Sequence, residues 1–413
     1  MLENLGHASE ARVSNLTRLT QGCVETVVLI VMRKRLAALA LAFPLWFGGC
    51  LGGSSAASLE PSITKPWRTP QAGLESTGDE SSVRRLPPVE TPFSFARDGR
   101  PFEGVLSVPA HVDGARLPSV VLVHGSGPMS RDGVMPGQLG LGFGFDFPVY
   151  AELAHELSRL GYVVARYDKR TCAGTLYCEA EIHGLGLIPT LADQDAVLDD
   201  FAEDAKAAYR RVAEYDFVDA ERIIFVGHSQ GAQLVPRLLT DLEEVRAGVM
   251  LTPPYGDVPA LLREQGQLLV RIMREAGKPD RISEGYELLR AAYWLDELKH
   301  GKPTPTRILG QPLPLWRSWI HASQEARRLA RTLRRPLLVV GGDYDYNVSK
   351  DQLSSWQHWL EGSPHRVAVL PCMTHALNCI SEADPRLIES RDIGRHIDRE
   401  LIDELGVFLT ETL

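Results

Sequence analysis

The sequence predicts an α/β fold with a mostly parallel, doubly wound sheet. Its short, continuous apolar runs are typical of parallel strands that are buried on both faces. Stretches with helical spacing of apolar residues lie between several of these runs, and alternation of strand with helix is typical of this class. The runs comprise residues 120–123, 162–165, 223–226, 248–251, 337–340 and 367–370.

The predicted domain opens with an antiparallel pair of strands. Residues 93–96 and 105–108 flank Asp98-Gly99, a dipeptide that favours a tight hairpin turn. We therefore expect the folded domain to begin near Thr91 and to cover residues 91–413.

Helices are predicted over residues 150–160, 197–212 and 397–408, where apolar residues recur at helical spacing. The stretch 257–335 lies between two predicted strands and contains helix-like segments but no convincing strand. We expect an inserted helical cap there.

The composition is that of an ordinary globular protein. The chain has 413 residues, of which 44% are hydrophobic and 23% charged. Its formal net charge is -9, and binding to nucleic acid needs clustered Lys and Arg instead. We therefore expect no nucleic acid among its partners.

An export signal is predicted over residues 32–49. A basic start, Arg33-Lys34-Arg35, precedes an apolar stretch and then Gly48-Gly49-Cys50. This order resembles a bacterial lipoprotein signal, which implies that Cys50 is lipidated, becomes the mature N-terminus and anchors the protein to a membrane of the cell envelope, in the periplasm or at the surface. The alternatives are ordinary cleavage after Ala57 and an uncleaved anchor.

Two segments flank this signal. Residues 1–31 are not expected in the mature protein, because an export signal normally begins with its basic region. Residues 50–90 are rich in Gly, Ser and Pro and have little apolar periodicity, so they predict a flexible tether.

Four cysteines remain in the exported domain, and an even number in an oxidising compartment suggests disulfides. Three connectivities are possible. The pairs Cys172–Cys178 and Cys372–Cys379 close the shortest loops. The alternative is that these cysteines pack as small apolar side chains.

A nucleophile is predicted at Ser229. The sequence Gly227-His228-Ser229-Gln230-Gly231 directly follows an apolar run and precedes a helical segment. At a strand-to-helix junction, small flanking residues allow a sharp turn that exposes the serine hydroxyl. The alternative is an ordinary glycine turn with a bystander serine.

An acid and then a histidine should follow on loops after later strands. Residues 337–340 are followed by a loop that contains Asp343 and Asp345, and residues 367–370 by one that contains His375. The imidazole would take the serine proton, and either carboxylate could fix its tautomer. A calcium loop is not expected, because Val348 occupies the position that such loops require as Gly.

An oxyanion hole needs two backbone N–H groups that face the developing negative charge. Gln230, directly after the predicted nucleophile, supplies one. The loop His124-Gly125-Ser126-Gly127-Pro128, after the first buried strand, makes the Ser126 N–H the second candidate. His124 itself is expected to be structural.

Together these residues resemble the α/β-hydrolase superfamily over residues 91–413, and this implies the α/β-hydrolase fold. The nearest likeness is a branch of bacterial serine esterases and dienelactone-hydrolase-like proteins. Its His-Gly-Ser-Gly-Pro-x-x-Arg-Asp loop is matched by residues 124–132, and residues 166–170 match a further segment. The Gly-x-x-Asp-x-x-Val pattern of its acid loop aligns with residues 342–348, which implies that Asp345 is the acid. Residues 171–190 depart from the family's short glycine-rich turn, so substrate preference could differ here.

The resemblance implies a serine hydrolase that cleaves a small-molecule carboxylic ester through an acyl-enzyme on Ser229, with Asp345 and His375 completing the triad. It implies no metal or organic cofactor. A thioesterase, an acyltransferase or a serine peptidase could use the same triad, but a prolyl-oligopeptidase-type enzyme normally carries a large β-propeller, which a forty-residue tether cannot form. From a different class, a binding lipoprotein that retains the fold without catalysis is the remaining alternative.

Overall fold

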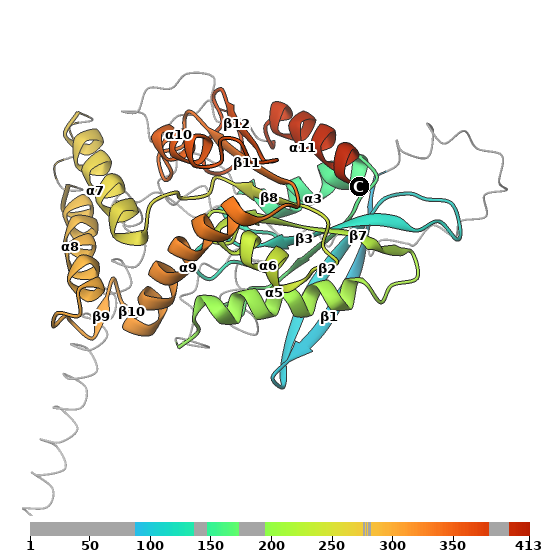
Figure 1. The fold of residues 1–413 in the computed structure, drawn as a ribbon, viewed down its shortest axis with the longest axis horizontal. Helices are drawn as coiled ribbons and strands as arrows, with labels where there is room; N and C mark the ends of the chain where they lie inside the picture. The colour runs from blue at the N-terminus through green and yellow to red at the C-terminus, as the bar shows by residue number, and fades with distance from the viewer. Residues whose placement is uncertain are drawn as a thin grey trace, which may run out of the picture.

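The computed structural model describes residues 87–135, 147–172, 195–275, 277, 279, 282–379 and 396–413. The predicted signal, most of the tether and most of the long 171–190 segment lie outside these residues. In the described part, the centre of the molecule is an eight-stranded sheet with the order β1-β2-β6-β3-β7-β8-β11-β12 (Figure 1). Its strands are β1 (Val89–Arg97), β2 (Arg100–Val108), β3 (Leu117–Val123), β6 (Val163–Tyr167), β7 (Val218–His228), β8 (Gly248–Leu251), β11 (Leu337–Gly342) and β12 (Arg366–Leu370).

The predicted antiparallel opening is confirmed, although its strands are longer than expected. β1 and β2 pair from Val89 with Val108 to Arg97 with Arg100. Asp98 and Gly99 both have positive φ, 53° and 75°, which is the conformation that a two-residue hairpin turn requires. β2 also pairs antiparallel with β6, whereas β6, β3, β7, β8, β11 and β12 run parallel to one another.

Both faces of the sheet are buried along its central strands, as the continuous apolar runs predicted. The prediction is wrong for residues 367–370, because β12 is an edge strand and Val369 is 43% exposed. Val121 and Val123 of β3 belong to one hydrophobic cluster, and Val120 and Leu122 to another on the opposite face. Alternation along a strand directs successive side chains to opposite faces, so a strand covered on both sides is apolar at every position.

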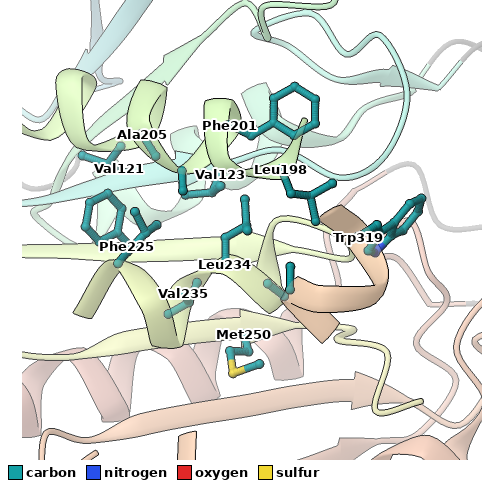
Figure 2. Packing of buried hydrophobic residues seen from close by; sticks show 14 of the residues in the cluster. Val121, Val123, Leu198, Phe201, Ala205, Phe225, Leu234, Val235, Met250 and Trp319 are labelled. Carbon is teal, nitrogen blue, oxygen red and sulfur yellow. The ribbon is translucent and has the colours of Figure 1, made fainter. Parts of the chain in front are cut away.

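Helices cover the two faces separately. The first cluster includes side chains of α5 (Leu198–Val212), α6 (Val235–Asp241), α9 (Leu313–Thr332) and α10 (Lys350–Trp359). Figure 2 shows part of this first cluster: side chains of α5, such as Phe201, lie near Val123 of β3, and Val235 of α6 belongs to the same cluster. The second cluster includes side chains of α3 (Val149–Arg159) and α11 (Arg399–Thr412).

The region between β8 and β11 holds α7 (Val258–Glu275), α8 (Ile282–Lys299) and α9, in agreement with the helix-like pattern. α7 and α8 pack side by side at one end of the molecule (Figure 1). α9 instead joins the layer over the sheet, where the Trp319 indole N–H donates to Gln233 Oε1 at 2.9 Å. A small hairpin, β9 (Arg307–Ile308) with β10 (Gln311–Pro312), also lies here and was not predicted, because two-residue strands leave no apolar periodicity.

Another two-stranded pair, β4 (Val134–Met135) with β5 (Phe147–Pro148), precedes α3.

In the described part of the chain, we find no helix with the length and apolarity needed to cross a membrane.

Candidate active site

The predicted site residues follow the carboxyl ends of parallel strands, which meet at one edge of the sheet. Ser126 follows β3, Ser229 follows β7, Asp345 follows β11 and His375 follows β12. The crevice outside this edge is where open α/β sheets bind their ligands. Sequence separations of up to about 250 residues are thus reduced to neighbouring loops.

Ser229 lies on a sharp turn directly after β7. Its φ is 53°, in the left-handed region, a conformation that costs a non-glycine residue about 1–3 kcal/mol and concentrates at functional sites. Its N–H donates to Leu251 O at 2.9 Å, which fixes the turn against the end of β8. The helical segment that follows begins as a 3₁₀ turn over Ala232–Leu234 and continues as α6.

The two glycines of the turn are required by close backbone contacts. A Cβ at Gly227 would lie 2.5 Å from the Gly231 carbonyl oxygen. A Cβ at Gly231 would lie 2.3 Å from Val123 O and 2.4 Å from His124 O, at the end of β3. The turn that carries Ser229 therefore packs directly on the start of the predicted oxyanion loop.

Asp345, which is buried, and His375, which is partly exposed, form a hydrogen-bonded pair. His375 Nδ1 lies 2.8 Å from Asp345 Oδ2, and the Asp345 side chain is 1% exposed. Asp345 Oδ1 accepts the N–H groups of Asn347 and Val348 at 2.8 and 2.7 Å. A carboxylate can only accept, so Nδ1 carries the proton and His375 Nε2 is left as a proton acceptor.

Asp343 has a different environment. It is exposed, and its Oδ1 accepts the Cys372 N–H at 2.8 Å. The geometry therefore brings Asp345 to the imidazole and leaves Asp343 at the start of the histidine loop.

Gly342 explains why the acid loop and the histidine loop lie so close together. A Cβ at this position would lie 1.8 Å from Met373 O, so only glycine permits the contact. The Tyr344 N–H donates to the same carbonyl at 3.2 Å, which joins the two loops.

The histidine loop is closed by the Cys372–Cys379 disulfide, as predicted. The two Cα atoms are 4.9 Å apart, within the range that a disulfide spans. Cys372 has a positive φ of 55°, and Met373 and Cys379 form an isolated antiparallel bridge. His375 thus lies inside a short covalent loop. Cys172 is also disulfide-bonded, but Cys178 lies outside the described residues, so that pairing stays a prediction.

His228, directly before Ser229, contacts the loop that carries His375. Its ring lies 5.0 Å from the His375 ring, centroid to centroid, and its Nε2 lies 2.9 Å from His375 O. Because a carbonyl oxygen can only accept, His228 Nε2 donates. This contact brings the nucleophile turn and the general-base loop together, although no hydrogen bond joins the Ser229 hydroxyl to His375 among the described residues.

The same ring connects to the oxyanion loop through Tyr150 of α3. The Gly125 N–H donates to Tyr150 Oη at 2.8 Å, and Tyr150 Oη lies 3.0 Å from His228 Nδ1, so the tyrosine hydroxyl donates to that nitrogen. Burial raises the pKa of Tyr150 well above its usual value, and burial, with the neighbouring His375, lowers the pKa of His228 to about 3. Both groups are therefore neutral near pH 7, and the network carries no net charge.

Both predicted oxyanion donors are available. Among the described residues, neither the Ser126 N–H nor the Gln230 N–H donates to an acceptor of the protein. A Cβ at Gly125 would lie 3.4 Å from the Ser229 Cβ, so the backbone of this loop runs directly beside the serine. Two unoccupied donors beside a serine hydroxyl suit an oxyanion.

The oxyanion loop rests on the segment that follows β6. Arg131 donates from Nη2 to Asp168 Oδ2 at 2.6 Å and from Nε to Oδ1 at 3.1 Å. Arg166 Nε donates to Asp132 Oδ1 at 3.0 Å. Residues 124–132 and 166–170, which the sequence singled out separately, thus form one cross-linked unit.

His124 is buried in the position expected of a structural residue. Its ring meets those of Tyr150 and Tyr167 edge to face, with centroids 5.3 and 4.9 Å away. Burial and the nearby Lys169 charge lower the pKa of His124 to about 3.

Sequence reasoning missed Tyr150 and His228 as connecting residues and gave Lys169 no role. In the sequence, Tyr150 is one apolar position of a predicted helix, and His228 is a residue of the Gly227–Gly231 motif to which no role was assigned. For Lys169, the available signal was a lysine four residues after the fully apolar run 162–165, where a charge is costly to bury. In the described part of the chain, we find no group of three or more His, Cys, Asp or Glu side chains that could hold a metal ion.

The fold and this edge of the sheet together define a class of protein. Residues 120–390 match the model of the alpha/beta hydrolase family, and the chain belongs to that family. Among individual proteins, it is 25% identical to "Esterase EstD" of Thermotoga maritima over 348 residues, which are 82% of this chain and 74% of the relative.

Solved structures are similar at lower identity. Est1E from Butyrivibrio proteoclasticus is 14% identical with a TM-score of 0.44, over 78% of this chain and 99% of that one. Porphyromonas gingivalis dipeptidyl peptidase 4 is 17% identical with a TM-score of 0.47, over 79% of this chain. The chain spans only 36% of the length of that peptidase.

Proposed function

We propose that the protein is a serine hydrolase that cleaves small-molecule carboxylic esters through an acyl-enzyme on Ser229. The observation that carries this proposal is the hydrogen bond between buried Asp345 and His375 Nδ1. It leaves His375 Nε2 as a proton acceptor, on a loop that His228 joins to the turn that holds Ser229. A positioned base beside a serine on a strained turn is the arrangement that activates a hydroxyl.

In the acylation step, Ser229 Oγ attacks the ester carbonyl carbon while His375 Nε2 takes the hydroxyl proton. The imidazolium that forms is stabilised by Asp345, whose charge is already held by two backbone N–H groups. The carbonyl oxygen becomes an oxyanion that accepts from the N–H groups of Ser126 and Gln230, each worth about 3 kcal/mol of barrier. His375 then protonates the leaving alkoxide, and the alcohol departs.

Deacylation repeats these steps with water. His375 Nε2 takes a proton from water, the hydroxide attacks the acyl carbon, and the same two N–H groups hold the second oxyanion. Collapse releases the carboxylic acid and returns the proton to Ser229 Oγ. No metal or organic cofactor enters either half of the reaction.

Esters are the favoured substrates because the Thermotoga maritima relative described above is named an esterase. A thioester or an amide could form the same acyl-enzyme, so a thioesterase, acyltransferase or peptidase activity is an outcome that the test must separate.

The test uses the domain from residue 58 onward with p-nitrophenyl esters of graded acyl length, and with a fluorophosphonate probe. We expect ester turnover and covalent labelling in the native protein and neither in Ser229→Ala. The matched control is Ser130→Ala, which removes another buried serine hydroxyl of the oxyanion loop region. Absence of labelling in the folded native domain would refute the proposal and favour a binding protein, whereas labelling with turnover of thioesters or peptides alone would move the activity to those classes.

We also propose that the protein is exported and held at a bacterial membrane by lipid on Cys50. The support is the order of basic residues, apolar stretch and Gly48-Gly49-Cys50 in the sequence. Metabolic labelling with a fatty-acid analogue should find lipid on the native protein and none on Cys50→Ser. A mature N-terminus at Ser58 would instead indicate ordinary cleavage.

A further inference from the structure

Lys169 is a buried lysine that the mechanism above does not use. It follows β6 and is 4% exposed. Its Nζ donates to Gly125 O at 2.6 Å and to Gln230 Oε1 at 2.9 Å, and it lies 4.2 Å from the centre of the Phe201 ring. One ammonium group therefore bonds both segments that supply the candidate oxyanion donors.

The bond to Gly125 O acts on the same peptide group that carries the Ser126 N–H. The structure has no cis peptide among its described residues, and in a trans peptide the C=O and the next N–H point in opposite directions. A donor that holds Gly125 O toward the protein interior consequently holds the Ser126 N–H outward, on the side away from Lys169. Withdrawal of electron density from the carbonyl also makes that N–H a stronger donor.

The position of the charge is costly for folding. Among the described residues, no carboxylate forms a salt bridge with Lys169. Asp204 of α5 is engaged by Arg97 and Arg170, Asp168 is engaged by Arg131, and His124, directly after β3, is neutral. Burial lowers the pKa of Lys169 to about 7, against the attraction of Asp204. A lysine buried at such a cost without an ion pair is typical of a functional position.

We propose that Lys169 is a positioning residue for the oxyanion hole, which fixes the 125–126 peptide and the Gln230 side chain so that the Ser126 and Gln230 N–H groups face the developing oxyanion. This inference rests on the proposed function, because it assigns a part in that reaction.

The test compares Lys169→Met with Lys206→Met. Met has nearly the shape of the lysine stem and cannot donate, and Lys206 is a second buried lysine, 7% exposed, that pairs with Glu203 and Asp241 away from the loop. For Lys169→Met we expect kcat on p-nitrophenyl acetate to fall about 10- to 100-fold, somewhat less than the loss of a whole oxyanion donor. KM should change little, because the oxyanion forms only after binding.

A second readout follows the oxyanion directly. Octyl trifluoromethyl ketone forms a hemiketal in which Ser229 Oγ bonds the carbonyl carbon, His375 receives the hydroxyl proton and the former carbonyl oxygen becomes the oxyanion. Its inhibition constant should rise by about the same factor as kcat falls, because both depend on the stabilised oxyanion. Lys169→Gln, which retains a neutral N–H donor, should lose less in both measurements.

The outcomes separate the two proposals. A native protein without ester turnover or probe labelling would overturn the proposed function and this inference with it. With an active native protein, unimpaired kcat in Lys169→Met, an equal loss in Lys206→Met, or unchanged ketone affinity would overturn this inference alone. If both Lys169 variants fail to fold while Lys206→Met folds, the lysine serves stability and the inference is also wrong.

Discussion

Replacement of Asp345 by Asn should reverse the proton position on the His375 imidazole, the proposed general base. Asp345 Oδ1 accepts two backbone N–H groups, from Asn347 and Val348. Only the amide oxygen of Asn can take that place, so the amide NH₂ must face His375 Nδ1, which the carboxylate Oδ2 now meets at 2.8 Å. Nδ1 then accepts, the proton moves to Nε2, and no acceptor remains for the serine proton.

The magnitude of this change is large. Loss of the correct tautomer in a serine triad costs about 10⁴-fold in kcat, which corresponds to about 5 kcal/mol of activation free energy. Asp343→Asn is the matched control, because Asn keeps a carbonyl oxygen for the Cys372 N–H and the site is exposed. We therefore expect Asp343→Asn to lower kcat much less than Asp345→Asn does.

The assay is kcat on p-nitrophenyl acetate for both variants, with circular dichroism to confirm that each is folded. A larger loss in Asp343→Asn than in Asp345→Asn would refute the assignment of the acid. A loss below tenfold in folded Asp345→Asn would refute the tautomer argument.

Three further predictions follow from contacts in the fold. Gly231→Ala should lower the free energy of unfolding by about 3 kcal/mol, since its Cβ would lie 2.3 Å from a β3 carbonyl; Gly406→Ala in α11, which meets only a side chain at 3.3 Å, should cost nothing in the same urea titration. Cys372→Ser, or mild reductant, should lower kcat by up to about a hundredfold before the domain unfolds, because the loop that carries His375 shifts. Simultaneous loss of activity and of the folded state would contradict this. Finally, the pKa of His124 is 6.5 in the unfolded chain and about 3 in the folded one. The unfolded chain therefore binds the proton first as the pH falls, and the free energy of unfolding should decrease from pH 6.5 toward pH 3. In His124→Phe this decrease should be shallower.

The sequence was sufficient for the class of fold because each signal was local. Continuous apolar runs such as residues 120–123 predict a strand that is buried on both faces, and Asp98-Gly99 predicts the position of a hairpin turn. The same is true of the turn at Ser229, whose glycines and strand context lie within ten residues. The short β9–β10 hairpin and the packing of α9 on the sheet layer had no such local signal.

The choice between Asp343 and Asp345 marks the limit of local reasoning. Spacing left both open, and a family pattern was needed to favour Asp345. In the folded chain, Gly342 packs on Met373 O, and this contact between distant loops brings Asp345 to His375 and Asp343 to the Cys372 N–H.

The sequence by itself determined the strands of the main sheet, several of the helices, the turn at Ser229 and the two loops that follow with an acid and a histidine. Only the tertiary structure decided that Tyr150 and His228 connect these loops and that Lys169 bonds both segments that carry the candidate oxyanion donors. The physical reason is that hydrogen bonds act between atoms about 3 Å apart. Residues 125, 150, 169 and 228 reach that separation only after parallel strands bring their carboxyl ends to one edge of the sheet.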